Sequence, residues 1–385
     1  MNTPTQATPK HTLLCASVFS GLMVFGSYQI MLSATNPTGL EYPRTFKAFQ
    51  VGELTQGLEK QLDLKLPIRS TLIALANTIR YQLFGGAGDQ VRTGKDNWLF
   101  IADELKYEGP RAHSKSTVDT AAALQTRVGL ITDLSKQLEA QGVKLVVALV
   151  PDKARIYADQ LKNADYPAYN QGRYKSALDG LKSNGVTTVD LFAVLAPAAK
   201  QGEIYYRTDT HWNQKGAVLA AKEIASVVQS LKLDLQKTTF TTQAAAQSEE
   251  RPGDLIRLMG LEFVSNRLRP KSDQESIEIT VEVIEKGAAP KSVGLFDDTS
   301  VPVALVGTSY SLRANFHGRL QEFMSVKVLN TAKDGGGFLQ AMTAYLKDDA
   351  FRTAKPRVLI WEIPERMLQS PLRDEKGWLE KNLLQ

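Results

Sequence analysis

The stretch VPVALVGTSYS, residues 301–311, joins an apolar run to a small polar turn. The run VPVALV is typical of a strand buried on both faces, and Gly307 and Thr308 place Ser309 where that strand ends. In an open α/β sheet, ligands bind beyond the carboxyl ends of the strands. Ser309 is therefore a candidate nucleophile, and the alternative is that it only forms the turn.

Other apolar runs alternate with segments of helical spacing. The expected strands are VKLVVALV (143–150), VTTVDLF (186–192), SVKVLN (325–330) and RVLIWEI (357–363), and the expected helices cover about 116–140, 171–183 and a segment from Asn213. Buried strands separated by helices predict an α/β fold with a mainly parallel sheet and flanking helices. IEITVEVI (277–284) alternates polar and apolar residues, which predicts an edge or antiparallel strand.

Polar residues follow several of these strands. They lie at 151–153, which contains Lys153, at 333–337, which contains three glycines, and at 362–366. Because the carboxyl ends of parallel strands share one edge of a sheet, this pattern predicts a cleft at that edge.

The N-terminus predicts a membrane anchor. Residues 12–32 carry no charge, and 21 helical residues span roughly 31 Å, which matches a hydrocarbon core. The upstream Lys10 favours an N-terminus inside and the rest of the chain outside, in the periplasm. A cleaved signal peptide is the alternative. We predict a signal anchor over 1–35, a linker with lead-in helices over 36–90, and one domain over 91–385.

Composition limits the classes of function. The net charge is +5, with scattered basic residues and no dense basic run, which argues against a nucleic-acid partner. The single cysteine, Cys15, lies in the predicted anchor and excludes an internal disulfide. Four histidines and no other cysteine argue against a zinc site, so we expect no metal and no cofactor.

The second notable stretch is RTDTHWNQKGA, 207–217. In extended backbone, Asp209 and His211 project from the same side. The carboxylate can then fix the imidazole tautomer and leave the other ring nitrogen free as a base for Ser309. From the residues alone, a hydrogen-bonded turn remains the alternative, and GTSYS lacks the second glycine of a GxSxG elbow.

DTHWN followed by GTSYS resembles the SGNH-hydrolase-like domain of the alginate O-acetyltransferases AlgJ and AlgX. LVVALVPDKARIY, RPGDLIRLM and WEIPER are similar to further blocks of that family, so the resemblance covers about residues 90–370. Asp and His precede Ser in this chain, which implies a circularly permuted SGNH fold. The predicted anchor and the short chain after WEIPER favour the AlgJ architecture. DNWLF, which lacks the usual glycine before the tryptophan, and Leu312-Arg313 depart from the family pattern and put the substrate in doubt.

The resemblance implies roles for individual residues. Ser309 would be the nucleophile, His211 the general base and Asp209 the orienting carboxylate. Tyr310 and Asn315 would help to shape the oxyanion site. Two further residues are substrate candidates with plainer alternatives. Trp212 would stack on a sugar or anchor its loop as core, and Lys153 would contact substrate or be a solvated loop charge.

The function implied is a membrane-anchored O-acetyltransferase in the periplasm, on the inner membrane. It would pass acetyl through Ser309 to an exopolysaccharide, with alginate first and cellulose or another polymer as alternatives. The expected partners are that polymer and a multi-pass, AlgI-like O-acyltransferase that supplies acetyl. A carbohydrate esterase with the same triad, and a non-catalytic polysaccharide-binding component of a secretion complex, are the competing functions.

Overall fold

The computed structural model describes residues 69–105, 120–162, 165–284 and 301–372, with the single positions 20, 21, 24, 375, 377, 378 and 381. Contacts divide the chain into two units, Met1–Ala76 and Asn77–Gln385, and every candidate site residue belongs to the second. Within the described residues, no helix is both long and apolar enough to span a membrane. Almost all of the predicted anchor, and residues 36–68 of the predicted linker and lead-in helices, lie outside these residues and stay predictions.

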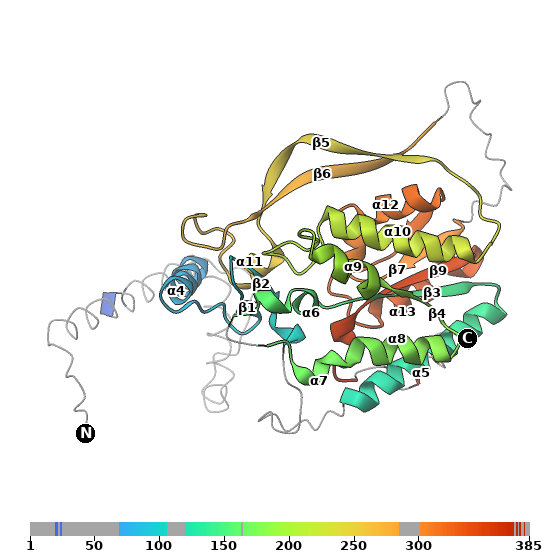
Figure 1. The fold of residues 1–385 in the computed structure, drawn as a ribbon, viewed down its shortest axis with the longest axis horizontal. Coiled ribbons are helices and arrows are strands. Elements are labelled where there is room, and N and C mark those ends of the chain that lie inside the picture. Colours follow the sequence, from blue (N-terminus) through green and yellow to red (C-terminus); the bar gives the residue numbers. More distant parts are fainter. Residues whose placement is uncertain are drawn as a thin grey trace, which may run out of the picture. The chain divides into compact units, whose positions relative to one another are not determined.

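A five-stranded sheet forms the centre of the second unit (Figure 1). Its strands are β3 (Lys144–Val150), β4 (Thr187–Asp190), β7 (Val303–Val306), β8 (Val328–Asn330) and β9 (Val358–Pro364). They lie in the order β4-β3-β9-β7-β8, and every pairing is parallel. The apolar runs therefore predicted a parallel sheet correctly.

Helices cover both faces of this sheet, because its strands are apolar on both faces. Val146 and Ala148 pack in one apolar core, and Val147 and Leu149 in the other. Helices α9 (Leu191–Ala199), α10 (Gln214–Ser230) and α12 (Phe316–Met324) contribute to the first core, and α5 (Thr120–Ala140), α8 (Arg173–Ser183) and α13 (Gln340–Lys347) to the second. The predicted α/β class, with flanking helices, is confirmed.

Further helices and strands lie outside the main sheet and its two helical layers. They are α4 (Arg69–Phe84), β1 (Val91–Thr93), β2 (Leu99–Ile101), α6 (Lys153–Ile156), α7 (Ala168–Gln171), α11 (Asp254–Leu258) and α14 (Asp349–Thr353). Strands β1 and β2 pair antiparallel and are joined by a tight turn in which Asp96 and Asn97 have positive φ.

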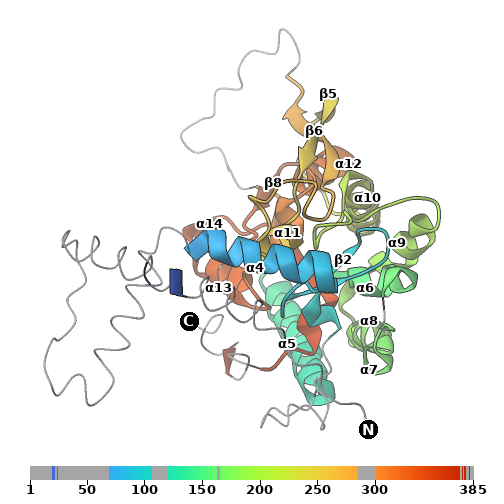
Figure 2. The ribbon, with the colours of Figure 1, turned by 90° about the vertical axis from the view of Figure 1, so that its left-hand side faces the viewer.

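A separate ribbon of two antiparallel strands, β5 (Phe240–Arg251) and β6 (Asp273–Glu282), lies next to α12 (Figure 2). The prediction of an edge or antiparallel strand for 277–284 is confirmed, since β6 pairs antiparallel with β5 in a two-stranded sheet of its own. Strand β5 was missed because FTTQAAAQSEER is largely exposed and lacks apolar alternation. Polar contacts join the ribbon to α12, including an Arg319–Glu278 ion pair at 2.8 Å.

Two other expectations need correction. In VTTVDLF the strand ends at Asp190, whose carboxylate accepts the N–H of Ala193, so Leu191 and Phe192 begin α9. An Asp that caps a helix start outweighs the strand propensity of the flanking apolar residues. In SVKVLN only Val328–Asn330 forms a strand, because Ser325 terminates α12 with φ 53°.

Candidate active site

Ser309 begins a 3₁₀ turn, Ser309–Leu312, directly after β7. The neighbouring strand β9 fixes this turn through Glu362, whose carboxylate accepts the N–H of Thr308 at 2.7 Å and the hydroxyl of Ser311 at 3.1 Å. Burial raises the pKa of Glu362. A Cβ on Gly307 would lie 2.5 Å from this carboxylate, which is why the strand must end in glycine. The turn is therefore rigidly attached to the sheet.

Ser309, His211 and Asp209 form one continuous hydrogen-bonded chain. Ser309 Oγ lies 2.7 Å from His211 Nε2, and His211 Nδ1 lies 2.5 Å from Asp209 Oδ1. The three residues are only 8%, 3% and 2% exposed, so bulk water does not compete for these bonds. An ionised carboxylate only accepts, so Nδ1 carries the ring proton and Nε2 is the free acceptor for the serine hydroxyl.

The environment of Asp209 keeps its carboxylate charged. Burial disfavours the charge, but hydrogen bonds from the ring and backbone of His211 and the positive charge of Arg251 outweigh burial, so the pKa of Asp209 is lowered. A charged Asp209 stabilises the imidazolium that forms when His211 takes a proton.

A second carboxylate, Asp254, lies beside the same imidazole and was not predicted from the sequence. Its Oδ2 is 3.8 Å from His211 Nδ1, and its backbone N–H donates to Asp209 Oδ2 at 3.0 Å. Its Oδ1 accepts the N–H of Thr210 at 2.7 Å. Burial and the charge of Asp209 raise the pKa of Asp254. No local spacing links residue 254 to 209–211, so only tertiary structure reveals it.

Asp209, His211 and Asp254 are also residue types that bind metals, and their ligand atoms lie within 4.8 Å of one another. Ligands about 2 Å from one ion are separated by roughly 3 Å or more. Nδ1 and Oδ1, at 2.5 Å, are closer than that and share a proton directly. The arrangement fits a proton relay better than a metal centre.

Trp212, a predicted substrate contact, and Tyr310, a predicted oxyanion-site residue, are both fully buried core residues. Trp212 is fully buried, and its ring packs 4.9 Å from that of Tyr310. The Tyr310 hydroxyl donates to the carbonyl of Thr210 at 2.9 Å, and its ring lies edge-on behind the His211 imidazole at 4.8 Å. For Trp212, the alternative of a core residue that anchors its loop is therefore the right one. The Tyr310 hydroxyl is used by the carbonyl of Thr210, so it is not free to donate to an oxyanion.

Asn315 has a left-handed backbone, with φ 51°, before α12. Its side-chain amide donates to Thr280 Oγ1 in β6 at 2.9 Å, so it joins the ribbon to α12 and does not face Ser309. The remaining oxyanion donor at the turn is the Ser309 N–H, which has no acceptor among the described residues.

Lys153 is neither solvated nor free to contact a substrate. Its ammonium donates to the carbonyls of Leu99, Arg207 and Asp209 at 2.6, 2.9 and 2.8 Å. An ammonium has three donors, and all are used. Burial lowers the pKa of Lys153 to about 8. The side chain holds the backbone of the 207–209 loop against β2.

Replacing Lys153 with methionine is expected to destabilise the protein by about 2–4 kcal/mol, because three carbonyls lose their donor in a buried place. Urea unfolding would measure this change. Lys136→Met on α5, whose side chain is 70% exposed, is the matched control and should change the free energy of unfolding by less than about 0.5 kcal/mol. Equal stabilities for the two variants would contradict the role of Lys153.

Gly253 packs directly against the backbone of the loop that carries Thr208 and Asp209. A Cβ at this position would lie 2.0 Å from the carbonyl oxygen of Thr208, and no rotation of a side chain relieves a clash with backbone. Gly253→Ala is expected to shift the Asp209 loop, lowering stability by about 2–3 kcal/mol. Thermal melting would test this, with Gly202→Ala, which has nothing within 4 Å of its Cβ, as the silent control.

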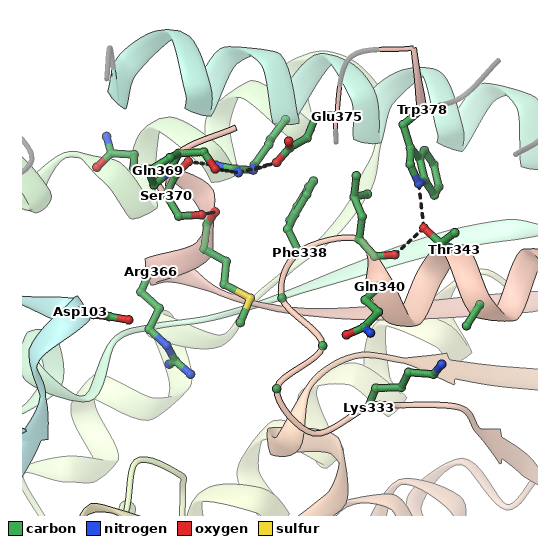
Figure 3. Close-up of a pocket in the computed structure, with 18 of the residues that line it drawn as sticks. Asp103, Lys333, Phe338, Gln340, Thr343, Arg366, Gln369, Ser370, Glu375 and Trp378 are labelled. Carbon is green, nitrogen blue, oxygen red and sulfur yellow. Dashed lines mark hydrogen bonds and ion pairs between the residues drawn. The ribbon is translucent and has the colours of Figure 1, made fainter. Parts of the chain in front are cut away.

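A cavity of about 1150 Å³ opens at the carboxyl edge of the sheet (Figure 3). Gly335–Gly337, Phe338, Arg366 and residues of α13 line it, and Ser309 is not among the lining residues. The guanidinium of Arg366 lies 5.7 Å from the ring of Tyr310, so the cavity begins beside the residue that follows Ser309. Two of the polar strand ends that predicted a cleft, at 333–337 and at Arg366, line this cavity, whereas residues 151–153 and 307–309 do not.

Comparisons with known proteins agree with the family resemblance of the sequence motifs. Residues 91–365 match the model of the SGNH hydrolase-like domain of acetyltransferase AlgX. The probable alginate O-acetylase AlgJ of Pseudomonas syringae pv. tomato is 32% identical over 369 residues, which is 95% of this chain and 90% of the relative. AlgJ of Pseudomonas putida is 34% identical over 328 residues, covering 84% of this chain and 81% of the relative.

Solved structures agree on the fold. The O-acetyltransferase domain of Pseudomonas putida AlgJ superposes with a TM-score of 0.64 at 32% identity, covering 76% of this chain and 98% of that one. Pseudomonas aeruginosa AlgX, at 24% identity, gives 0.53 over 71% of this chain and 61% of its own, and shows the fold alone.

The family match over residues 91–365 identifies an SGNH-hydrolase-like protein, and the parallel α/β sheet with a hydrogen-bonded Ser–His–Asp chain at its edge agrees with this class. Within that class, the family match over most of the domain and the AlgJ relatives place the chain in the AlgJ/AlgX acetyltransferase family.

Proposed function

We propose that the protein is an alginate O-acetyltransferase that carries acetyl on Ser309. The observation that supports this most is the unbroken chain from Ser309 Oγ through His211 to Asp209, at 2.7 and 2.5 Å. Its AlgJ relatives are named probable alginate O-acetylases, which supports alginate as the acceptor.

In the first half-reaction, Ser309 Oγ attacks the carbonyl carbon of an acetyl donor while its proton passes to His211 Nε2. The Ser309 N–H faces the oxyanion of the tetrahedral intermediate. The C–O bond to the leaving group then breaks, and His211 returns its proton to that group. Acetyl-Ser309 is left with a neutral imidazole.

In the second half-reaction, a sugar hydroxyl attacks the acetyl carbonyl and gives its proton to His211 Nε2. Collapse transfers acetyl to the sugar oxygen and returns the proton to Ser309. Transfer exceeds hydrolysis only where the acceptor is held close and water is kept away. We assign the sugar chain to the cavity lined by Arg366 and Gly335–Gly337, because the Arg366 guanidinium lies 5.7 Å from the ring of Tyr310, the residue after Ser309.

The proposal also covers where the protein is located and how the acetyl group reaches it. Residues 12–32 would anchor the protein in the inner membrane and hold Ser309 in the periplasm. The acetyl group would reach this side through a multi-pass, AlgI-like acyltransferase. These points rest on the sequence and on the resemblance to the family.

Mapping of the acyl group tests the proposal. The purified full-length protein in detergent would receive an activated aryl acetate labelled with ¹³C, with oligomannuronate, with cello-oligosaccharide, or with no sugar. Peptide mass spectrometry would locate the label on the protein and on the sugar. We expect it on the peptide containing Ser309, and then on oligomannuronate.

The other outcomes separate the alternatives. Acetyl on cello-oligosaccharide would change the polymer and keep the chemistry. Labelled Ser309 that yields only free acetate would favour the esterase. A protein that carries no label at Ser309 and acetylates nothing would contradict an enzyme and favour the non-catalytic binding component.

A further inference from the structure

Both carboxylate oxygens of Asp209 make polar contacts, and those of Oδ2 are to residues more than 40 positions later in the sequence. Oδ1 is taken by the backbone and ring N–H groups of His211. Oδ2 accepts the N–H of Asp254 at 3.0 Å and lies 3.5 Å from Nη1 of Arg251, at the end of β5. At 3.5 Å the Arg251 contact is an interaction of charges more than a hydrogen bond.

Arg251 is held in this position by two other groups. Its Nε pairs with Glu275 Oε2 at 2.8 Å, and its guanidinium lies 4.5 Å from the centroid of the Tyr206 ring. Nη1 is buried and has no hydrogen-bond acceptor among the described residues. A buried guanidinium N–H without an acceptor is costly, and the carboxylate of Asp209, 3.5 Å from Nη1, provides a negative charge that stabilises it.

Other charged groups near Asp209 also affect its ionisation. Lys153 donates to the Asp209 backbone carbonyl, and Asp254 adds a carboxylate 3.8 Å from the same imidazole. Asp273, at the start of β6, accepts the N–H groups of Arg207 and Thr208, and Glu275 pairs with Arg251. Three acidic side chains thus surround Asp209, and Arg251 is the cation whose side chain reaches its carboxylate.

We propose that Arg251 is a positioning residue for the acyl transfer: its charge on Oδ2 keeps Asp209 ionised and aligned with His211, and so extends the reaction to lower pH. The inference rests on the proposed function. The sign follows from electrostatics, since a cation at this place opposes protonation of both Asp209 and the imidazole that it supports. Without that cation, the pair takes up a proton at a higher pH and loses its base.

The test compares two variants that both lose the guanidinium and differ in charge. Full-length Arg251→Gln and Arg251→Lys would be assayed with 4-nitrophenyl acetate from pH 4.5 to 9. In Arg251→Gln we expect the midpoint of the low-pH limb of kcat/KM to rise by about one pH unit, and in Arg251→Lys to stay within about 0.3 unit of the wild type. Arg257→Gln removes an exposed charge from α11 and should shift nothing.

A third variant is expected to shift the low-pH limb in the opposite direction, so that the inference can be tested even if both Arg251 variants fail to fold. Glu275→Gln removes the anion that competes for Arg251 and should move the limb to lower pH. A uniform loss of rate in both Arg251 variants, with no shift of the limb, would mean that Arg251 only packs, and would overturn the inference. An unshifted limb in Arg251→Gln and Glu275→Gln would do the same.

Failure of the two proposals is distinguishable. If Ser309→Ala hydrolysed the ester as fast as the wild type, the proposed function would fail and the role of Arg251 with it. If Ser309→Ala is inactive and the limb of Arg251→Gln coincides with that of the wild type, the inference about Arg251 alone fails.

Discussion

Replacing Ser309 with alanine is expected to lower kcat/KM for an activated acetyl ester by at least about 10⁴-fold, which is about 5.4 kcal/mol of transition-state stabilisation. The Ser309 hydroxyl is the proposed nucleophile that forms the acyl intermediate, and alanine offers none. The loss concerns chemistry and not folding, because Ser309 Oγ makes one hydrogen bond, to His211, and alanine fits the same turn. The melting temperature should therefore stay close to that of the wild type.

Ser311→Ala is the matched control, since Ser311 lies two residues later in the same buried turn. Its hydroxyl donates to Glu362 and has no contact with His211 in the described structure. We expect a loss of about 1 kcal/mol in stability and less than a tenfold change in rate. Similar rate losses in the two variants would indicate that the turn, and not the Ser309 hydroxyl, is what matters.

The second large effect is expected at His211. Glutamine in its place keeps a similar volume and removes the base, which should reduce turnover by about 10³–10⁴-fold. The pH profile should change as well. Without an imidazole to accept the Ser309 proton, the residual rate should increase with hydroxide concentration and show no low-pH limb. Stopped-flow or end-point release of acetate between pH 5 and 9 would measure both.

His317→Gln is the control for this experiment. The ring of His317, on α12, uses Nε2 to donate to the carbonyl of Val328 at 2.8 Å, and burial lowers its pKa. Its replacement should affect stability and leave the pH profile unchanged. If His317→Gln removed the limb and His211→Gln kept it, the assignment of the base would be wrong.

Predictions from the sequence were accurate where local pattern and burial coincide. Apolar runs such as VKLVVALV became parallel strands because both faces of the sheet are covered by helices. The spacing of Asp209 and His211 correctly put both side chains on one side of their loop. These inferences need nothing beyond the neighbours along the chain.

They were least accurate for polar and aromatic residues at the site. Trp212 was predicted to stack on a sugar or to anchor its loop as core, Tyr310 to shape the oxyanion site, and Lys153 to contact substrate or to be a solvated charge. In the structure they are buried and seat the loop that holds Asp209. Whether a tryptophan or a lysine faces solvent depends on what packs against it, which neighbouring residues along the chain do not reveal.

The sequence by itself determined the parallel α/β sheet, the strand-end position of Ser309 and the pairing of Asp209 with His211, since each follows from periodicity or from separations of two residues. Tertiary structure alone decided that Ser309, 98 residues from His211, lies 2.7 Å from its free nitrogen. It also brought Arg251 and Asp254 to the far oxygen of Asp209. The physical reason is that charge–charge and hydrogen-bond energies depend on distance in space, and a largely polar strand and a five-residue helix carry no local signal of where they will pack.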